Sequence, residues 1–144
     1  RFKVLLELCR RFHEEPMNLG VQFSSSRDIY HHFQTRLGNL KQERFIIVIL
    51  DNKHRFLSET TVTVGLLNRS LVHPREVFAE AIEQRAAAII CIHNHPSGDS
   101  SPSEEDKRIT RRLQESGELL GIPLLDHVII SKEDFTSFAD EGWL

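Results

Sequence analysis

The sequence predicts an α/β domain in which helices flank a mixed β-sheet. Two unbroken apolar runs, residues 45–50 and 87–92, have the length and character of strands that are buried on both faces. Segments with apolar residues at helical spacing alternate with these runs along the chain. This alternation is typical of a sheet covered by helices, and 144 residues are enough for about one such domain.

The composition excludes several classes of protein. Hydrophobic residues make up 40% and charged residues 27% of the chain, which is the balance of a globular protein. No apolar run approaches the roughly 18 residues of a spanning helix, so we expect no membrane partner. Cys9 and Cys91 are too few for a disulfide framework, which favours a reducing cytoplasm. The net charge of −3 gives no general attraction to nucleic acid, and we interpret Arg108, Arg111 and Arg112 as a solvated helix face.

The first 25 residues predict a separate unit ahead of the main domain. Apolar residues over 2–13 recur at helical spacing and predict one helix with a single apolar face. The stretch from Glu14 to Ser26 contains Pro16, Gly20 and three serines, which is typical of a linker. We therefore divide the chain into a helix and linker, 1–25, and a main domain, 26–144.

The first half of the main domain predicts a helix and a pair of strands. Ser26 is expected to cap a helix that ends at Gly38 and turns four residues inward: Ile29, Tyr30, Phe33 and Leu37. Residues 45–50 predict a strand, 51–53 a hairpin turn and 55–64 the second strand.

The second half predicts two helices and three strands. Pro74 fits the first turn of a helix whose inward residues are Val77, Phe78, Ala81 and Ile82. Ser103 opens a longer helix that Gly121 ends, with one face formed by Ile109, Leu113, Ser116 and Leu120. The strands are expected at 87–92, at 124–130 and, in a shorter form, near 135–138.

Two histidines follow the 87–92 strand, at the point where it runs into a polar loop. Residues two apart on an extended chain point to the same side, so His93 and His95 can converge on one ion. The loop 96–102 is rich in Pro, Gly and Ser, and it returns the chain so that Asp106 approaches the histidines. Two imidazoles and one carboxylate form a catalytic zinc set that leaves a position open for water, whose pKa zinc lowers toward ~7.

A hydrolase of this kind also needs a group that carries a proton. Glu43 stands just before the 45–50 strand, and it reaches the edge of His93 and His95 if the 45–50 and 87–92 strands are neighbours. Glu59 is the alternative glutamate.

Each of these residues also has a structural interpretation. On spacing alone, a His-x-His pair at a strand end favours a metal site no more than a packing role. Ser103 and Asp106 fit a Ser-x-x-Asp capping box, which needs no metal. For Asp126 and His127 we favour a core or surface position on a strand, with support of the metal ligands from behind as the alternative. We interpret Cys91 as a small core residue.

The spacing of the polar residues resembles a known signature. His93, one residue, His95, seven residues, Ser103, two residues and Asp106 match the pattern of the JAMM (MPN+) zinc metallopeptidases and deubiquitinases. The segments His-Asn-His-Pro-Ser-Gly-Asp at 93–99 and Leu-Leu-Gly-Ile-Pro-Leu-Leu-Asp-His at 119–127 resemble the bacterial RadC family. The resemblance implies a JAMM/MPN-like, cytidine-deaminase-like fold over 26–144 and a place in the bacterial cytoplasm.

The resemblance also implies roles for single residues in a hydrolase that cleaves peptide or isopeptide bonds of a protein or peptide partner. One zinc ion per chain would be held by His93, His95 and Asp106, with Glu43 as the catalytic glutamate and Ser103 steadying the tetrahedral intermediate. Many JAMM peptidases carry Ser or Thr between the two histidines. Asn94 stands there in this chain, as it does in RadC-like proteins. The resemblance therefore implies a peptide or isopeptide substrate less strongly than it implies the metal ligands.

Two other functions stay open at this point. A DNA-associated protein, either a nuclease or a repair accessory, is the first, because RadC-like proteins usually carry a helix-hairpin-helix module and residues 1–15 resemble its last helix. That missing upstream module would be the natural DNA contact. A non-catalytic scaffold is the second and ranks last, because every ligand type is present. The sequence leaves open whether the chain forms a homodimer.

Overall fold

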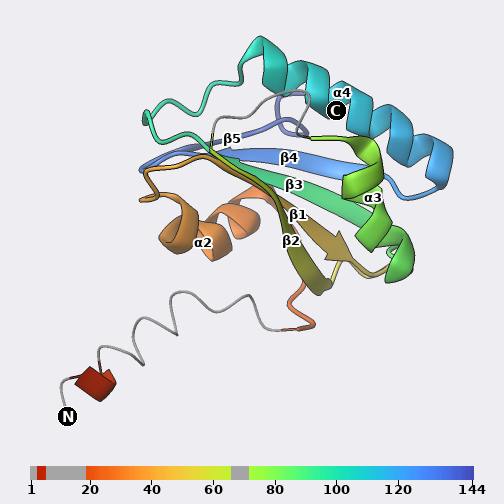
Figure 1. Cartoon of the computed structure of the whole chain (residues 1–144), viewed down its shortest axis with the longest axis horizontal. Helices are drawn as coiled ribbons and strands as arrows, with labels where there is room; N and C mark the ends of the chain where they lie inside the picture. Colours follow the sequence, from red (N-terminus) through yellow and green to blue (C-terminus); the bar gives the residue numbers. More distant parts are fainter. Residues whose placement is uncertain (1–2, 6–18, 66–71) are drawn as a thin grey trace.

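A five-stranded mixed sheet forms the centre of the domain (Figure 1). The computed structural model describes residues 3–5, 19–65 and 72–144. The sheet order is β2-β1-β3-β4-β5, with bounds Phe56–Val64, Arg44–Leu50, Ala88–Asn94, Leu124–Ile130 and Phe135–Ser137. β1 runs antiparallel to both β2 and β3, β3 and β4 are parallel, and β5 is antiparallel to β4. The parallel pair is possible because a helix connects β3 to β4.

Helices cover both faces of the sheet, which gives three layers (Figure 1). α2, Ser26–Leu37, lies on one face, and α3, Pro74–Glu83, and α4, Glu104–Leu120, lie on the other. The predicted α/β class, a mixed sheet flanked by helices, is therefore confirmed. Among the helices in the described part of the chain, none has both the length and the apolar run that crossing a membrane requires.

Each face of the sheet packs on its own hydrophobic cluster, and alternate residues of β1 belong to the two clusters. Phe45, Ile47 and Ile49 join the cluster under α3 and α4, whereas Ile46 and Val48 join the cluster under α2. A strand that contributes to both cores must be apolar at every position, which explains the unbroken run. The same alternation on β3 sends Cys91, which is fully buried, to the α4 side.

The N-cap of α2 departs from the sequence prediction, whereas the C-cap of α4 agrees with it. Ser25, not Ser26, is the N-cap of α2, and its hydroxyl accepts a hydrogen bond from the Asp28 N–H at 3.1 Å. Ser25 has the extended backbone of a cap, whereas the Ser26 hydroxyl donates instead to the Asp140 carboxylate. Gly121 ends α4 in the left-handed conformation, with φ of 74°, as expected for a C-terminal glycine.

The inward faces of α3 and α4 were predicted only in part. Ile82 is 54% exposed and Leu120 is 46% exposed, so both are wrong as core residues. Ser116 is only partly buried. The buried face of α4 shares Ile109 and Leu113 with the predicted face, and its other members are Asp106, Thr110 and Gly117. This face follows the same helical spacing, but it includes polar residues that an apolar pattern does not detect.

The structure describes only part of the predicted N-terminal unit. The predicted helix over 2–13 lies largely outside the described residues, as does most of the linker. The last part of the linker packs on the domain, because the Gly20 N–H donates to the Phe56 carbonyl at 3.0 Å and Phe23 is 5% exposed. The boundary at residue 26 stays a prediction.

Candidate metal centre

The candidate site lies at one edge of the sheet, where β3 ends and β1 begins. His93 belongs to β3 and is 1% exposed. In the antiparallel register of β1 and β3, Phe45 is opposite His93, which brings Glu43 to the same edge. α4 begins beside this edge, so Asp106 in its first turn also reaches the histidines. The neighbouring strands on which the Glu43 prediction depended are therefore present.

Two carboxylates flank the ring of His93 on opposite sides. Glu43 Oε2 lies 3.8 Å from His93 Nε2, and Asp106 Oδ1 lies 3.5 Å from His93 Nδ1. The second carboxylate oxygen of Asp106 lies 3.2 Å from His95 Nε2. The structure thus brings His93, His95 and Asp106 together, with Glu43 beside them.

One geometric grouping differs from the predicted ligand set. Ligand atoms of Glu43, His93 and His95 all lie within 4.8 Å of one another, a spacing compatible with one metal ion. Asp106 is not in that group, because it approaches the other nitrogen of His93. Asp106 nevertheless contacts both imidazoles at shorter distances than Glu43 contacts one. The ligand set His93, His95 and Asp106, with Glu43 as the catalytic glutamate, stays a prediction.

His95 has one ring nitrogen fixed by the loop that follows it. Its Nδ1 lies 2.8 Å from the Asp99 carbonyl oxygen, which can only accept, so Nδ1 carries the hydrogen. In the neutral ring the lone pair is then on Nε2, whereas in the protonated ring Nε2 donates to Asp106. Burial alone would lower the pKa of His95, but the Asp106 carboxylate and the Asp99 carbonyl outweigh it and raise the pKa.

His93 is the strongest indication that this cluster holds a cation. Both of its ring nitrogens are buried, and neither has a hydrogen-bond partner among the described residues. A buried polar group without a partner is costly, and native proteins rarely keep one without a reason. A cation among two imidazoles and two carboxylates would take one nitrogen of this ring as a ligand, and nitrogen and oxygen donors of this kind suit zinc.

Asp106 has a structural role and faces the site as well. Its Oδ2 accepts a hydrogen bond from the Ser103 N–H at 2.8 Å, and the Ser103 hydroxyl accepts from the Asp106 N–H at 3.0 Å. The capping box is thus present, and the two interpretations of this segment are compatible. Burial would raise the pKa of Asp106, but the hydrogen bond to His95, the charge of His93 and the Ser103 N–H lower it well below the usual range.

Ser103 and Glu59 have contrasting positions. Ser103 is exposed at the start of α4, next to Asp106. Glu59 lies on β2 opposite Val48, in the middle of the strand, and its carboxylate forms a two-fold ion pair with Arg36. Glu59 is therefore too far along the sheet to serve as the glutamate of this site.

Sequence reasoning missed the contacts of Thr110 and Asn94. The Thr110 hydroxyl donates to the Asp106 carbonyl at 2.6 Å and lies 2.6 Å from His127 Nδ1. Asn94 is 1% exposed and hydrogen-bonds the residues on either side of Glu43. The helical spacing of Thr110 from Asp106 was a usable signal, whereas nothing in the sequence showed the partners of Asn94.

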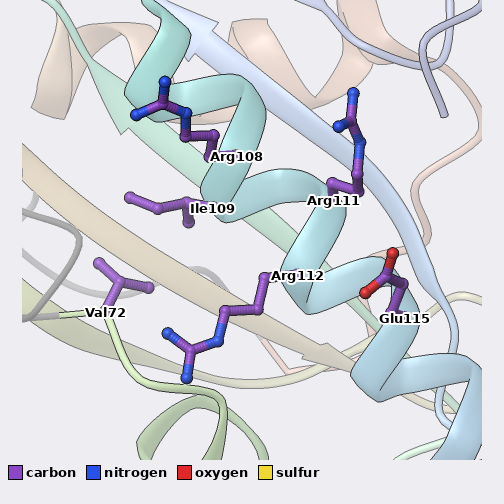
Figure 2. Close-up of a pocket in the computed structure, with 6 residues that line it drawn as sticks. All are labelled: Val72, Arg108, Ile109, Arg111, Arg112 and Glu115. Atoms are coloured by element: carbon purple, nitrogen blue, oxygen red, sulfur yellow. The ribbon is translucent and has the colours of Figure 1, made fainter.

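The arginines of α4 do not form an anion site. Arg108, Arg111 and Arg112 line a depression of about 250 Å³ with Val72 and Glu115, and their guanidinium groups spread apart (Figure 2). Their side chains do not converge on one point, as phosphate recognition by several arginines would require. This arrangement agrees with a solvated helix face.

The layered sheet with a polar cluster at its edge defines a JAB-type domain. The family model described as "RadC-like JAB domain" matches residues 23–143, and the chain belongs to that family. It is 48% identical over 142 residues to a UPF0758 protein of Syntrophotalea carbinolica, covering 99% of this chain and 63% of that protein. It is 44% identical to a UPF0758 protein of Thermotoga maritima, covering 99% and 64%, and 46% identical to one of Methanosarcina mazei, covering 97% and 61%. The chain thus spans less than two thirds of these relatives.

Proposed function

We propose that this chain is a zinc-dependent hydrolase that cleaves a peptide or isopeptide bond. One observation carries the proposal: His93 is buried with two unpartnered ring nitrogens, and a carboxylate lies within 4 Å of each. A packing histidine would use these nitrogens in hydrogen bonds, whereas a metal ligand needs at least one lone pair free. The JAB family membership supports the same reaction class.

Three residues would hold the ion in this proposal. His93 and His95 supply imidazole nitrogens, and Asp106 supplies a carboxylate that the Ser103 N–H already orients. Zinc bound there would act as a Lewis acid on the carbonyl group and lower the pKa of water beside it. The Asp99 carbonyl keeps the His95 ring in the tautomer that presents Nε2 to the site.

Glu43 and Ser103 would move protons and stabilise charge. The Glu43 side chain is 23% exposed beside His93, so its carboxylate can take a proton from water and deliver it to the leaving amine. The Ser103 oxygen accepts from the Asp106 N–H, which leaves its own hydrogen available for donation. That hydrogen would stabilise the negative charge that develops on the carbonyl oxygen.

The test compares Glu43→Gln with wild type on a peptide library, with zinc content measured on the same samples. We expect cleavage to fall by about a hundredfold or more while zinc content is retained, because the proton carrier is lost and the ligands remain. Glu118→Gln, an exposed change on α4, serves as the matched control. A full zinc load with unchanged cleavage in Glu43→Gln would reject the mechanism.

Other features of the whole protein stay predictions. We propose a protein or peptide as the substrate and a bacterial cytoplasmic setting. DNA contact through an upstream module and a homodimer are further expectations. Salt-dependent DNA binding by residues 26–144 alone would favour the DNA-associated alternative instead.

A further inference from the structure

The hydrogen-bonded ladder between β1 and β3 stops at the candidate site. The last paired residues of this ladder are Phe45 and His93, whereas the β3–β4 ladder continues further, with the His95 N–H donating to the Ile130 carbonyl at 2.8 Å. Residues 42–44 therefore lie beyond the last paired residues of the β1–β3 ladder. A backbone segment beyond the end of a ladder is held loosely unless another group hydrogen-bonds to it. The position of Glu43 therefore depends on what binds residues 42–44.

The side chain of Asn94 supplies both missing hydrogen bonds. Its Oδ1 accepts from the Arg44 N–H at 2.6 Å, and its Nδ2 donates to the Gln42 carbonyl at 3.0 Å. These two backbone groups stand on either side of Glu43. On the opposite side, the Gly65 N–H donates to the Glu43 carbonyl at 2.8 Å, so this backbone is held from both neighbouring strands.

We propose that Asn94 is a positioning residue that fixes Glu43 at the metal centre by continuing the β1–β3 ladder with its amide group. The chemistry suits Asn in particular. The amide offers one acceptor and one donor at the end of a short stem, and the Arg44 N–H and the Gln42 carbonyl determine which end faces which. Asp would lack the donor, and Ser could not reach both groups. The role in catalysis rests on the proposed function, but the positioning itself does not.

The test uses zinc alone as the probe and needs no substrate. Nuclear magnetic resonance follows the side-chain carboxyl carbon of Glu43, assigned by its loss in Glu43→Gln, while zinc is added. It also follows hydrogen exchange of the Arg44 amide. In wild type, zinc shifts the Glu43 signal. In Asn94→Ala, we expect zinc to bind without shifting this signal, and the Arg44 amide to exchange about tenfold faster or more.

Asn94→Asp covers the case in which Asn94→Ala does not fold. It keeps the acceptor for the Arg44 N–H, but it replaces the donor with a carboxylate oxygen that the Gln42 carbonyl repels, so we expect slow Arg44 exchange but a weakened response of Glu43 to zinc. Asn52→Ala, an exposed change in the turn at the other end of β1, is the matched control and should resemble wild type.

The outcomes separate this inference from the proposed function. An unchanged Glu43 response and unchanged Arg44 exchange in Asn94→Ala would overturn the positioning role. If wild type shows no response of Glu43 to zinc, the proposed function fails. Arg44 exchange in the two Asn94 variants then still decides whether Asn94 holds this segment.

Discussion

The hydroxyl oxygen of Thr110 lies 2.6 Å from Nδ1 of His127, and this contact joins α4 to β4 behind the candidate metal centre. The same hydroxyl donates to the Asp106 carbonyl at 2.6 Å, so it must accept its second hydrogen bond from His127. His127 therefore carries a hydrogen on Nδ1, and the lowered pKa of its buried ring favours the neutral form. Thr110 and His127 thus hold the helical turn that carries Asp106, although neither is a predicted metal ligand.

We predict that His127 makes the ion-free protein sensitive to acid. Burial, and then the neighbouring His93, lower the pKa of His127 to about 3, against about 6.5 for an unfolded chain. The unfolded state thus binds a proton between these pH values and the folded state does not. Stability from this group is fully present above pH ~6.5 and falls by about 1.4 kcal/mol for each pH unit below it.

His127→Asn isolates this contribution, because Asn keeps a donor for Thr110 but does not titrate. Urea unfolding in the presence of a chelator should give a steeper loss of stability from pH 7 to pH 5 for wild type than for His127→Asn. At pH 7 the variant should be less stable by about 2 kcal/mol, because packing of the ring on Phe138 is lost. Equal pH slopes for the two proteins would contradict this assignment. The raised pKa of His95 acts in the opposite direction, with stability lost as pH rises, and it is common to both proteins.

Ser103→Gly should separate the capping role of Ser103 from its chemical role. Glycine at an N-cap costs only a few tenths of a kcal/mol, so the free energy of unfolding should change little. The variant has no hydroxyl, and we expect cleavage of the peptide library to fall by about a hundredfold. Ser24→Gly, an exposed serine before α2, is the control. Cleavage at the wild-type rate by Ser103→Gly would contradict the chemical role of Ser103 and show that it only caps α4.

Gly117→Ala should destabilise the domain although it adds a better helix former. A Cβ there would lie 2.5 Å from the Ile122 carbonyl oxygen and 3.3 Å from Phe78 Cζ. The gain in helix propensity is about 1 kcal/mol, and we expect the clash to exceed it by about 1–3 kcal/mol. Ser116→Ala, one residue earlier, should stay within about 0.5 kcal/mol of wild type. Urea unfolding that shows Gly117→Ala to be more stable than wild type would contradict the close packing of α4.

The strands were predictable because their apolar patterns follow from their place in the sheet. β4 matches its predicted bounds, and β1 and β3 differ from theirs by at most two residues, since both strands are buried on two faces. The inward face of α4 was less predictable. It contains Asp106 and Thr110, which are buried because they hydrogen-bond at the metal centre, and Gly117, which permits a close approach.

The candidate site was predictable where its residues are close in sequence. His93, His95, Ser103 and Asp106 fall within one strand, loop and helix start, so a local signature includes all four. The prediction of Glu43 depended on the pairing of β1 with β3. The sequence does not show this pairing, so it was assumed, and the structure contains it. The partners of Asn94 depend on where the ladder ends, about 50 residues away, and no local pattern carries that information.

The zinc content of the purified chain tests the central claim most directly. Protein prepared with zinc and without chelator should contain about one zinc per chain, and His95→Ala should contain almost none, because one of the ligands is lost. His31→Ala, an exposed histidine on α2, should keep the wild-type content. Wild-type protein without bound zinc, or a His95→Ala variant that binds zinc as well as wild type, would contradict a metal centre at this edge of the sheet.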